Sequence, residues 1–413
     1  TQSTWGPKYN RYSFSVKAAT TMFSPAMKVL VPIANSSEPM EAVIIADVLT
    51  RSAADVTVAA VGGQLKVSAC HGIKLIADAL IEDCSTNNYD LIALPGGMPG
   101  AVNLKECAIL ESMIRDQAAE GKPFGAICAS PAVSLGPWGL LRGLKATCYP
   151  SFMEQLRPHA IVVDSRVQLD GHVVTSQGPA TTMEFAISLV ELLCGKEKAH
   201  EISEPMVMQT NYGEDHKYKE LNPMEWTFSD TPQILVPIAN GTEEMEAVII
   251  IDILRRANCN VKVASVEESL EIKASRNVKM EADVSIDEAS RYSYDLIVLP
   301  GGLGGASSFA KCEKLVTLLR EQMESKRPCG AICASPALVL EPHGLLKGKK
   351  ATCFPTLSEK LADEGEVDNR VLIDGNLITS RGPGTAMEFA LAIVHKFYGR
   401  DNALQLAKAL LFA

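Results

Sequence analysis

The sequence contains the same domain twice. The segment at 28–52, "KVLVPIANSSEPMEAVIIADVLTRS", aligns with "QILVPIANGTEEMEAVIIIDILRRA" at 233–257. "GAICASP" occurs at 125–131 and again at 330–336, also 205 residues later. The offset becomes 204 only near the end of the domain, where "TSQGPATTMEFA" aligns with "TSRGPGTAMEFA". A repeat of this length is a whole domain, so the chain must fold into two similar units in tandem and not into a short-repeat solenoid.

The repeat also sets the domain boundaries. Residues 27–209 form the first copy and residues 232–413 the second, and each copy is long enough to bury its own core. The stretch 210–231 is polar, contains Gly and Pro and lacks an apolar period, which predicts a linker. Residues 1–26 are basic, rich in hydroxyl side chains and free of Asp and Glu. This composition is typical of a transit peptide and favours a chloroplast location, while a disordered extension of a cytoplasmic or nuclear protein is the alternative.

Composition excludes several classes of partner. The net charge is −10 and the Lys and Arg residues are scattered, so we expect no nucleic-acid partner. The sequence has no apolar run of the ~18 to 20 residues that a membrane span needs, so we expect no membrane partner. The 11 cysteines lack the spacing of a disulfide framework or a zinc set. "LPGGMPGA" and "LPGGLGGA" lack the lysine and hydroxyl of a phosphate loop. We therefore expect free thiols, no metal and no cofactor.

Strand-like and helix-like segments alternate within each copy. "KVLVPIA", "DVTVAAV", "YDLIALP" and "PFGAIC" are short apolar runs, as expected for strands buried on both faces. The segments between them, such as "EAVIIADVLTRS", have helical spacing. This order predicts two α/β domains, each a mainly parallel sheet with helices on both faces. In such sheets the reactive site lies at the carboxyl ends of the strands.

A cysteine stands at such a strand end in each copy. Cys128 and Cys333 follow "GAI" directly, at the point where the chain must turn into a helix, and small residues, Ala129 and Ala334, follow them. A helix amino terminus would lower the pKa of the thiol and make it more reactive. A nucleophile, a redox switch and a small buried apolar residue all fit this position.

Two neighbouring features suit a reactive thiol. "PGG" ends another strand, and its two glycines can turn backbone N–H groups inward as an oxyanion hole requires, although Gly-Gly is often just a turn. A glutamate in the first turn of a helix, flanked by Met and Ala, would have a raised pKa in an apolar pocket and could share a proton with a thiolate. Most glutamates there merely complement the helix dipole. The candidate residues are Gly96, Gly97 and Glu41 in the first copy and Gly301, Gly302 and Glu246 in the second.

These motifs resemble one family. "VPIANGTEEMEAV", "YDLIVLPGG", "GAICASP" and "TSRGPGTAMEFALAIV" are similar to the DJ-1/PfpI family, and within it to the DJ-1 subgroup, over nearly all of both copies. The tandem order resembles the plant members. The resemblance implies a flavodoxin-like fold, with Cys128 paired to Glu41 and Cys333 to Glu246. It also implies oxidation of the cysteine to a sulfinic acid and glutathione-independent conversion of methylglyoxal to lactate. Because members are commonly homodimers, it implies an intramolecular pseudo-dimer here.

The chain departs from the family pattern at the pocket. The peptidases of the wider family follow the cysteine with His, which Ala129 and Ala334 replace, so a hydrolase is the least favoured function. Tyr149 and Phe354 stand where the DJ-1 subgroup has a pocket His. Loss of a general acid or base costs ~100- to 10,000-fold in rate, so we expect weak glyoxalase activity.

The two copies also differ near the pocket. The second has Arg276 and Arg381 at positions that the resemblance places near the pocket, where the first has His71 and Gln177. An arginine near the thiol favours the thiolate, so we expect Cys333 to oxidise more readily.

The leading hypothesis is a stress-response protein that acts on small reactive dicarbonyls or oxidants. A redox-regulated binding or chaperone-like module with protein clients and little turnover is the alternative.

Overall fold

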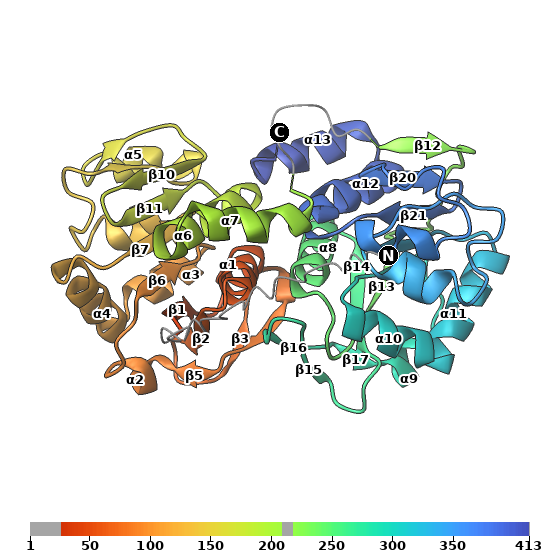
Figure 1. Ribbon diagram of the computed structural model, residues 1–413, viewed down its shortest axis with the longest axis horizontal. Coiled ribbons are helices and arrows are strands. Elements are labelled where there is room, and N and C mark those ends of the chain that lie inside the picture. The colour runs from red at the N-terminus through yellow and green to blue at the C-terminus, as the bar shows by residue number, and fades with distance from the viewer. Residues whose placement is uncertain (1–25, 209–217, 413) are drawn as a thin grey trace, which may run out of the picture.

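The computed structural model describes residues 26–208 and 218–412, so the predicted transit segment lies almost wholly outside the described residues. Two α/β units lie side by side, the first in red to yellow-green and the second in green to blue (Figure 1). Each is built on a mainly parallel sheet with helices on both faces, as the sequence predicts. Among the described residues, no helix has the length and apolarity that a membrane span requires.

The first sheet has a flavodoxin-like strand order, in which β1 lies between β2 and β6. Only one neighbouring pair of strands in it is antiparallel, at the edge. In spatial order the strands are β10 (Val167–Asp170), β11 (Val173–Ser176), β7 (Phe124–Ile127), β6 (Leu91–Leu94), β1 (Lys28–Ile33), β2 (Asp55–Ala60) and β5 (Ala79–Leu80). A separate two-stranded ribbon joins β8 (Lys145–Ala146) to β9 (Ile161–Val162).

The second sheet repeats this order and adds one edge strand. In spatial order its strands are β12 (Lys219–Leu221), β20 (Val371–Asp374), β21 (Leu377–Ser380), β19 (Cys329–Ile332), β18 (Leu296–Leu299), β13 (Gln233–Ile238), β14 (Asn260–Ser265) and β17 (Val284–Ser285). The added strand, β12, comes from the segment predicted as a linker. It pairs with β20, and the nearby Trp226 is 3% exposed and donates its ring N–H to the Gly375 carbonyl at 3.1 Å. The end of that segment is therefore part of the second domain, a role that its lack of an apolar period concealed.

Helices cover both faces of each sheet. Along β1, Val29, Val31 and Ile33 join the apolar cluster that contains α1 and α6, whereas Leu30 joins the cluster that contains α4. This alternation is the period-2 pattern of a strand buried on both sides. The helices of the first unit are α1 (Pro39–Arg51), α2 (Ile81–Cys84), α3 (Gly100–Lys105), α4 (Ala108–Ala119), α5 (Met153–Leu156), α6 (Thr182–Cys194) and α7 (Lys196–Ser203). Those of the second are α8 (Glu244–Arg256), α9 (Ile286–Ala289), α10 (Leu303–Lys311), α11 (Glu313–Glu324), α12 (Ala386–Tyr398) and α13 (Arg400–Ala409).

The two units share one interface. Helices α1 and α8 pack against each other at its centre, and a single apolar cluster continues from one unit into the other (Figure 1). A four-stranded sheet also crosses the interface, in the order β15 (Glu271–Lys273), β16 (Lys279–Glu281), β4 (Lys74–Ile76) and β3 (Lys66–Ser68). Antiparallel β4 and β16 join the units in it. Each unit therefore buries apolar surface that it would expose alone.

Candidate active site

The cysteine of "GAICASP" stands in a strained turn in both repeats. Cys128 follows β7 with φ 63°, and Cys333 follows β19 with φ 62°. A left-handed conformation at a residue other than Gly is uncommon and costs of order 1–3 kcal/mol, which the surrounding structure must offset. The segment after Cys128 is only a five-residue π-helical turn, Pro131–Leu135, where the sequence predicted a helix. The sharp turn itself is as predicted.

Backbone hydrogen bonds hold both elbows in the same way. The Cys128 N–H donates to the Ser176 carbonyl at 3.0 Å, and the Cys128 carbonyl accepts from the Tyr149 N–H at 2.8 Å. The Cys333 N–H donates to Ser380 and the Cys333 carbonyl accepts from Phe354 at the same two distances. The aromatic residues that replace the family histidine are therefore next to the cysteines.

The predicted glutamates reach the cysteines. Glu41 lies in the first turn of α1 and is fully buried, and its Oε2 accepts the Gly96 N–H at 2.7 Å. Its carboxyl group lies beside the Cys128 side chain and raises the pKa of that thiol. Glu246 in α8 repeats this arrangement, with the Gly301 N–H at 2.7 Å and the Cys333 thiol. In both glutamates Oε1 is buried without a nitrogen or oxygen partner among the described residues. Such an orphan oxygen favours the neutral carboxylic acid, because a buried charge needs donors.

The backbone N–H groups of the two glycines in each site do not both play the role that the sequence predicted. The N–H groups of Gly96 and Gly301 donate to the glutamates, so they are not free to form an oxyanion hole. The next N–H, from Gly97 or Gly302, acts on the thiol by lowering its pKa. Space is equally restricted, because a Cβ on Gly96 would lie 2.6 Å from the Cys128 Cβ and 3.0 Å from the Ala129 backbone nitrogen. Ala129, and by symmetry Ala334, therefore borders the site through its backbone.

The predicted fall in thiol pKa is wrong. Burial is the largest effect, and it raises the pKa of the Cys128 and Cys333 thiols well above the usual value, with the facing glutamate adding to the rise. Burial also raises the pKa of Glu41 to about 8 and that of Glu246 to about 7. Desolvation and a nearby carboxyl group thus outweigh the dipole of one short turn. When the pair loses one proton, the remaining negative charge is distributed between sulfur and carboxyl oxygen, and the two groups titrate together.

The arginines that were predicted to activate Cys333 do not lie against its thiol. The Arg276 side chain donates to the Ser275 carbonyl at 3.2 Å. Arg381 lies 3.8 Å from Asp368 and lowers the pKa of Cys353, which burial raises overall. Neither is among the main influences on the pKa of Cys333, which is 8% exposed. The basis for its faster oxidation is therefore absent, and Cys128, which is partly exposed, is the more accessible thiol.

In each repeat, an arginine of the other repeat forms an ion pair with the glutamate at the N-cap of the site helix. Sequence reasoning did not predict these two ion pairs. Arg256 of α8 pairs with Glu38, the N-cap of α1, at 2.5 Å, and Arg51 of α1 pairs with Glu243, the N-cap of α8, at 3.1 Å. Glu38 in turn raises the pKa of Glu41. The two sites are thus connected across the interface by buried charges. The signal in the sequence was a basic residue at the end of each helix, but its partner lies about 200 positions away.

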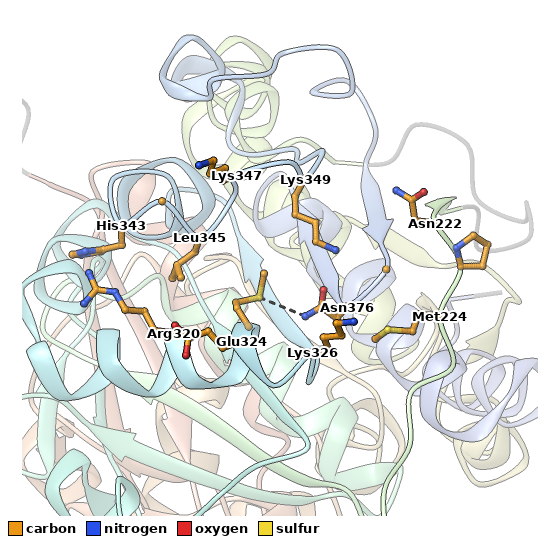
Figure 2. A pocket seen from close by; sticks show the side chains of 14 residues that line it. Asn222, Met224, Arg320, Glu324, Lys326, His343, Leu345, Lys347, Lys349 and Asn376 are labelled. Atoms are coloured by element: carbon orange, nitrogen blue, oxygen red, sulfur yellow. Dashed lines mark hydrogen bonds between the residues drawn. The ribbon is translucent and has the colours of Figure 1, made fainter.

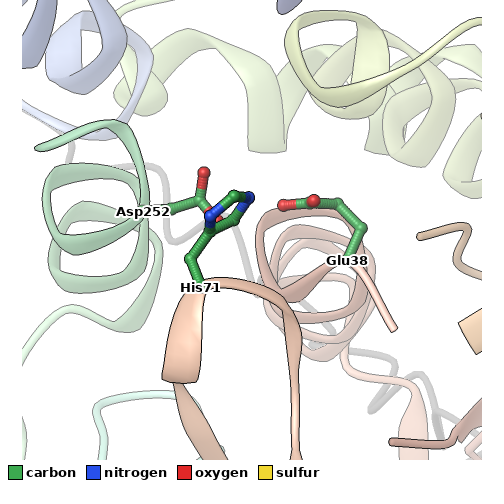
Figure 3. Close-up of side chains that lie close together, drawn as sticks. All are labelled: Glu38, His71 and Asp252. Carbon is green, nitrogen blue, oxygen red and sulfur yellow. The ribbon is translucent and has the colours of Figure 1, made fainter. Parts of the chain in front are cut away.

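His71 and two acids lie together beside this ion pair. Figure 3 shows the His71 ring between the carboxyl groups of Glu38 and Asp252, and their ligand atoms lie within 4.8 Å of one another. Arg256 already bonds both acids, at 2.5 Å in each case. Burial and the neighbouring arginines lower the pKa of His71 to about 4. Because a metal ion would have to displace or lie beside the guanidinium, the cluster does not suit one.

Each repeat also covers the pocket of the other. The Tyr149 hydroxyl donates to the Ala409 carbonyl at 3.0 Å, at the end of α13 in the second repeat. Across the pseudo-symmetric contact, Arg370 donates to the Val207 carbonyl at 2.9 Å. Each of these two hydrogen bonds joins residues more than 160 positions apart in the sequence, so no local sequence pattern predicts them. An isolated repeat would lack this cover.

Comparison with known proteins identifies the family of the chain. The model of the DJ-1/PfpI family matches residues 27–192 and again residues 232–396. The chain belongs to the DJ-1/PfpI family. It is 60% identical to protein DJ-1 homolog B of Arabidopsis thaliana, over 98% of this chain and 92% of that protein. It is 57% identical to protein DJ-1 homolog A of the same plant, over 94% of this chain and 100% of that protein.

A more distant relative matches only one repeat. Glutathione-independent glyoxalase DJR-1.2 of Caenorhabditis elegans is 35% identical over 44% of this chain and 95% of that protein. A single family domain therefore corresponds to half of this chain, and the tandem order is shared with the two plant proteins. The chain is a tandem protein of the DJ-1 type.

Proposed function

We propose that this protein limits carbonyl and oxidative stress through its two elbow cysteines, and that each converts methylglyoxal to lactate slowly and without glutathione. The observation that carries the proposal is the same in both repeats: a fully buried carboxyl group lies beside a single cysteine in a strained, left-handed turn. The name of the worm relative supports the choice of reaction.

The chemistry needs only the thiol, the carboxyl group and water. The thiolate sulfur bonds to the aldehyde carbon, and the carboxyl proton passes to the former carbonyl oxygen, giving a hemithioacetal. The carboxylate then removes the hydrogen of that carbon as a proton and returns it to the neighbouring ketone carbon, while the proton of the new hydroxyl group moves to the ketone oxygen, which leaves the thioester of lactate. Water cleaves the thioester, releases lactate and restores the thiol, so no external oxidant or reductant takes part. A carboxyl pKa near 7 to 8 suits both directions of proton transfer at neutral pH.

The aromatic residues explain why turnover should be slow. Tyr149 and Phe354 occupy the place next to each cysteine carbonyl, and Phe354 has no group that exchanges a proton. The Tyr149 hydroxyl is committed to the Ala409 carbonyl, and burial raises its pKa. Glu41 or Glu246 must therefore carry every proton transfer alone.

Lactate formation from methylglyoxal in glutathione-free buffer tests the proposal. We expect the full-length protein to form lactate and the double variant Cys128→Ser, Cys333→Ser to form none above background. Cys194→Ser is the matched control, because Cys194 is exposed and distant from both elbows in sequence. A double variant as active as the parent would sink the catalytic role.

A redox-regulated binding module is the second candidate, and the exposure of Cys128 favours it. A partly exposed thiol with a carboxyl and an N–H beside it can hold the oxygens of a sulfinic acid. Mild peroxide should then add two oxygen atoms to Cys128 before Cys333, measured by peptide mass spectrometry. Equal and slow oxidation of all 11 cysteines would contradict it.

Assembly and location belong to the same proposal. The cross-repeat contacts support an intramolecular pseudo-dimer that needs no second chain to complete its sites. The basic, acid-free composition of residues 1–26 supports delivery to a plastid. Import of a fluorescent fusion into isolated chloroplasts, with and without these residues, tests the location.

A further inference from the structure

A basic cavity lies in the second repeat, away from the cysteine. It has a volume of about 740 Å³. It is lined by three parts of that repeat and by part of the segment 210–231, the former linker. They are helix α11, the loop 343–349, the turn at Gly375–Asn376, and the segment Asn222–Met224 that follows β12. Figure 2 shows the side chains arranged around this space.

The cavity lies at the opposite end of the sheet from the active site. Asn376 directly precedes β21, and its carbonyl accepts the Cys329 N–H at 2.8 Å at the start of β19. Cys333 follows the other end of β19. Four residues of strand separate the two ends by roughly 13 Å. The cavity is therefore not part of the cysteine pocket.

Positive charge dominates the lining. Arg320, Lys326, Lys347 and Lys349 line the cavity, with Glu324 as the only carboxylate in the lining. Within the described residues, none of these four cations forms an ion pair, and Lys349 donates to a backbone carbonyl, that of Asp374, at 3.0 Å. The excess of positive charge stands out in a chain whose net charge is −10. Unpaired cations around a concave space attract anions.

The lining also offers groups for a neutral part of a ligand. Met224, Met323 and Leu345 supply apolar surface, and the Asn222 side chain supplies a further polar group. A few polar groups in a mixed lining of this volume are typical of small-molecule sites. Lysines bind phosphate oxygens as point charges, and arginine binds them in a forked geometry.

The first repeat provides an internal comparison, because it has the same fold without two of these four cations. At the equivalent places it has Gly121 for Lys326, Trp138 for His343 and Leu144 for Lys349. It keeps the other two cations, as Arg115 for Arg320 and Arg142 for Lys347, and Arg115 is ion-paired with Glu111 at 2.6 Å. The fold therefore does not require Lys326 and Lys349, and the first repeat has no strand from the linker at the corresponding edge.

We propose that this cavity binds a small molecule that carries two or more phosphate groups. The four cations bind the phosphates, and the apolar side chains of α11 and the Asn222–Met224 segment contact the rest of the ligand. The former linker thus completes a binding site that the first repeat lacks. The proposal does not depend on turnover at the cysteines.

Calorimetric titration of the full-length protein with sodium tripolyphosphate, at physiological ionic strength, tests the site. We expect one saturable site per chain, with a Kd at least tenfold weaker in the double variant Lys326→Gln, Lys349→Gln. The variant Lys326→Gly, Lys349→Leu carries the residues of the first repeat at both places, so it should fold and lose binding equally. The control Lys196→Gln, Lys198→Gln removes two exposed charges from α7 in the first repeat and should keep the parental Kd.

The outcomes separate the proposal from general charge attraction. No saturable binding, or the same loss of affinity in the control as in the double variant, would overturn it. A second titration with ATP, compared with that of tripolyphosphate, shows what the apolar side chains of the cavity contribute to the affinity. Tighter binding of ATP that Met224→Ser weakens assigns a nucleotide-like ligand, and equal binding of both assigns recognition of the phosphates alone.

Discussion

Replacing Glu41 by Gln should separate proton transfer from every other role of this side chain. In the parent, Oε2 accepts the Gly96 N–H at 2.7 Å while the carboxyl group lies beside the Cys128 side chain. A glutamine has the same shape, and its carbonyl oxygen can accept the same N–H. What it cannot do is release and regain a proton, a step worth about 100- to 10,000-fold in rate. That loss corresponds to roughly 3 to 5 kcal/mol of activation free energy.

Stability should change in the opposite direction. Burial raises the pKa of Glu41 from 4.5 to about 8, so at pH 7 the folded protein must take up a proton that the unfolded chain does not hold. Glutamine needs no proton. Glu41→Gln should therefore keep the free energy of unfolding at pH 7 or raise it, by an amount on the order of 1 to 3 kcal/mol.

The assay uses Cys333→Ser as the parent, so that only the first site reports. Lactate formation from methylglyoxal gives the rate, and urea unfolding at pH 7 gives the stability. Glu111→Gln in α4, where the side chain is 32% exposed, is the control and should change neither quantity appreciably. A Glu41→Gln variant within threefold of the parental rate would refute proton transfer by Glu41. A variant that lost activity together with stability would show that the residue is structural.

Three further predictions follow from the buried charges and the pocket. Burial raises the pKa of Glu244 from 4.5 to about 7, so the proton that it holds stabilises the folded state at low pH, and this stability is lost as the pH rises from about 5 to 7. Over that window the unfolding free energy of the parent should fall by on the order of 1 to 3 kcal/mol more than that of Glu244→Gln. Parallel pH profiles of the two proteins would contradict this prediction. Arg256→Met leaves Glu38 and its neighbouring acid without their cation and should destabilise the protein by about 3 kcal/mol in urea unfolding, with partial recovery on adding Glu38→Gln; an unchanged midpoint would show that the pair contributes nothing. Tyr149→His restores an imidazole beside Cys128 and should raise lactate formation about tenfold or more in the Cys333→Ser parent, whereas a lower rate would mean that the hydroxyl bond to Ala409 matters more.

The fold could be predicted from the sequence because its signals are local and occur twice. The apolar runs at each strand, the helical period of 39–51 and the cysteine at the end of "GAI" appear in both copies at one offset. The same holds for Glu41 and Cys128, which lie together because the carboxyl ends of neighbouring parallel strands share one edge.

Other features depend on contacts that no local pattern encodes. The thiol pKa follows from burial and from a facing carboxyl group, and both become known only when the side chains are placed. The first glycine N–H of each pair binds the glutamate, which the sequence motif does not show. The pairing of Arg256 with Glu38 joins residues 218 positions apart, and β12 forms only because an edge of the second sheet lies nearby.

The rates of the two single-cysteine variants test the central claim, that the chain holds two complete Cys–Glu sites. The measurement is lactate formation from methylglyoxal by Cys128→Ser, by Cys333→Ser and by the parent, under the same glutathione-free conditions. The account predicts that each variant keeps part of the activity and that the two rates add up to the parental rate. A single variant that abolishes turnover, or two variants that both keep the full parental rate, would contradict it.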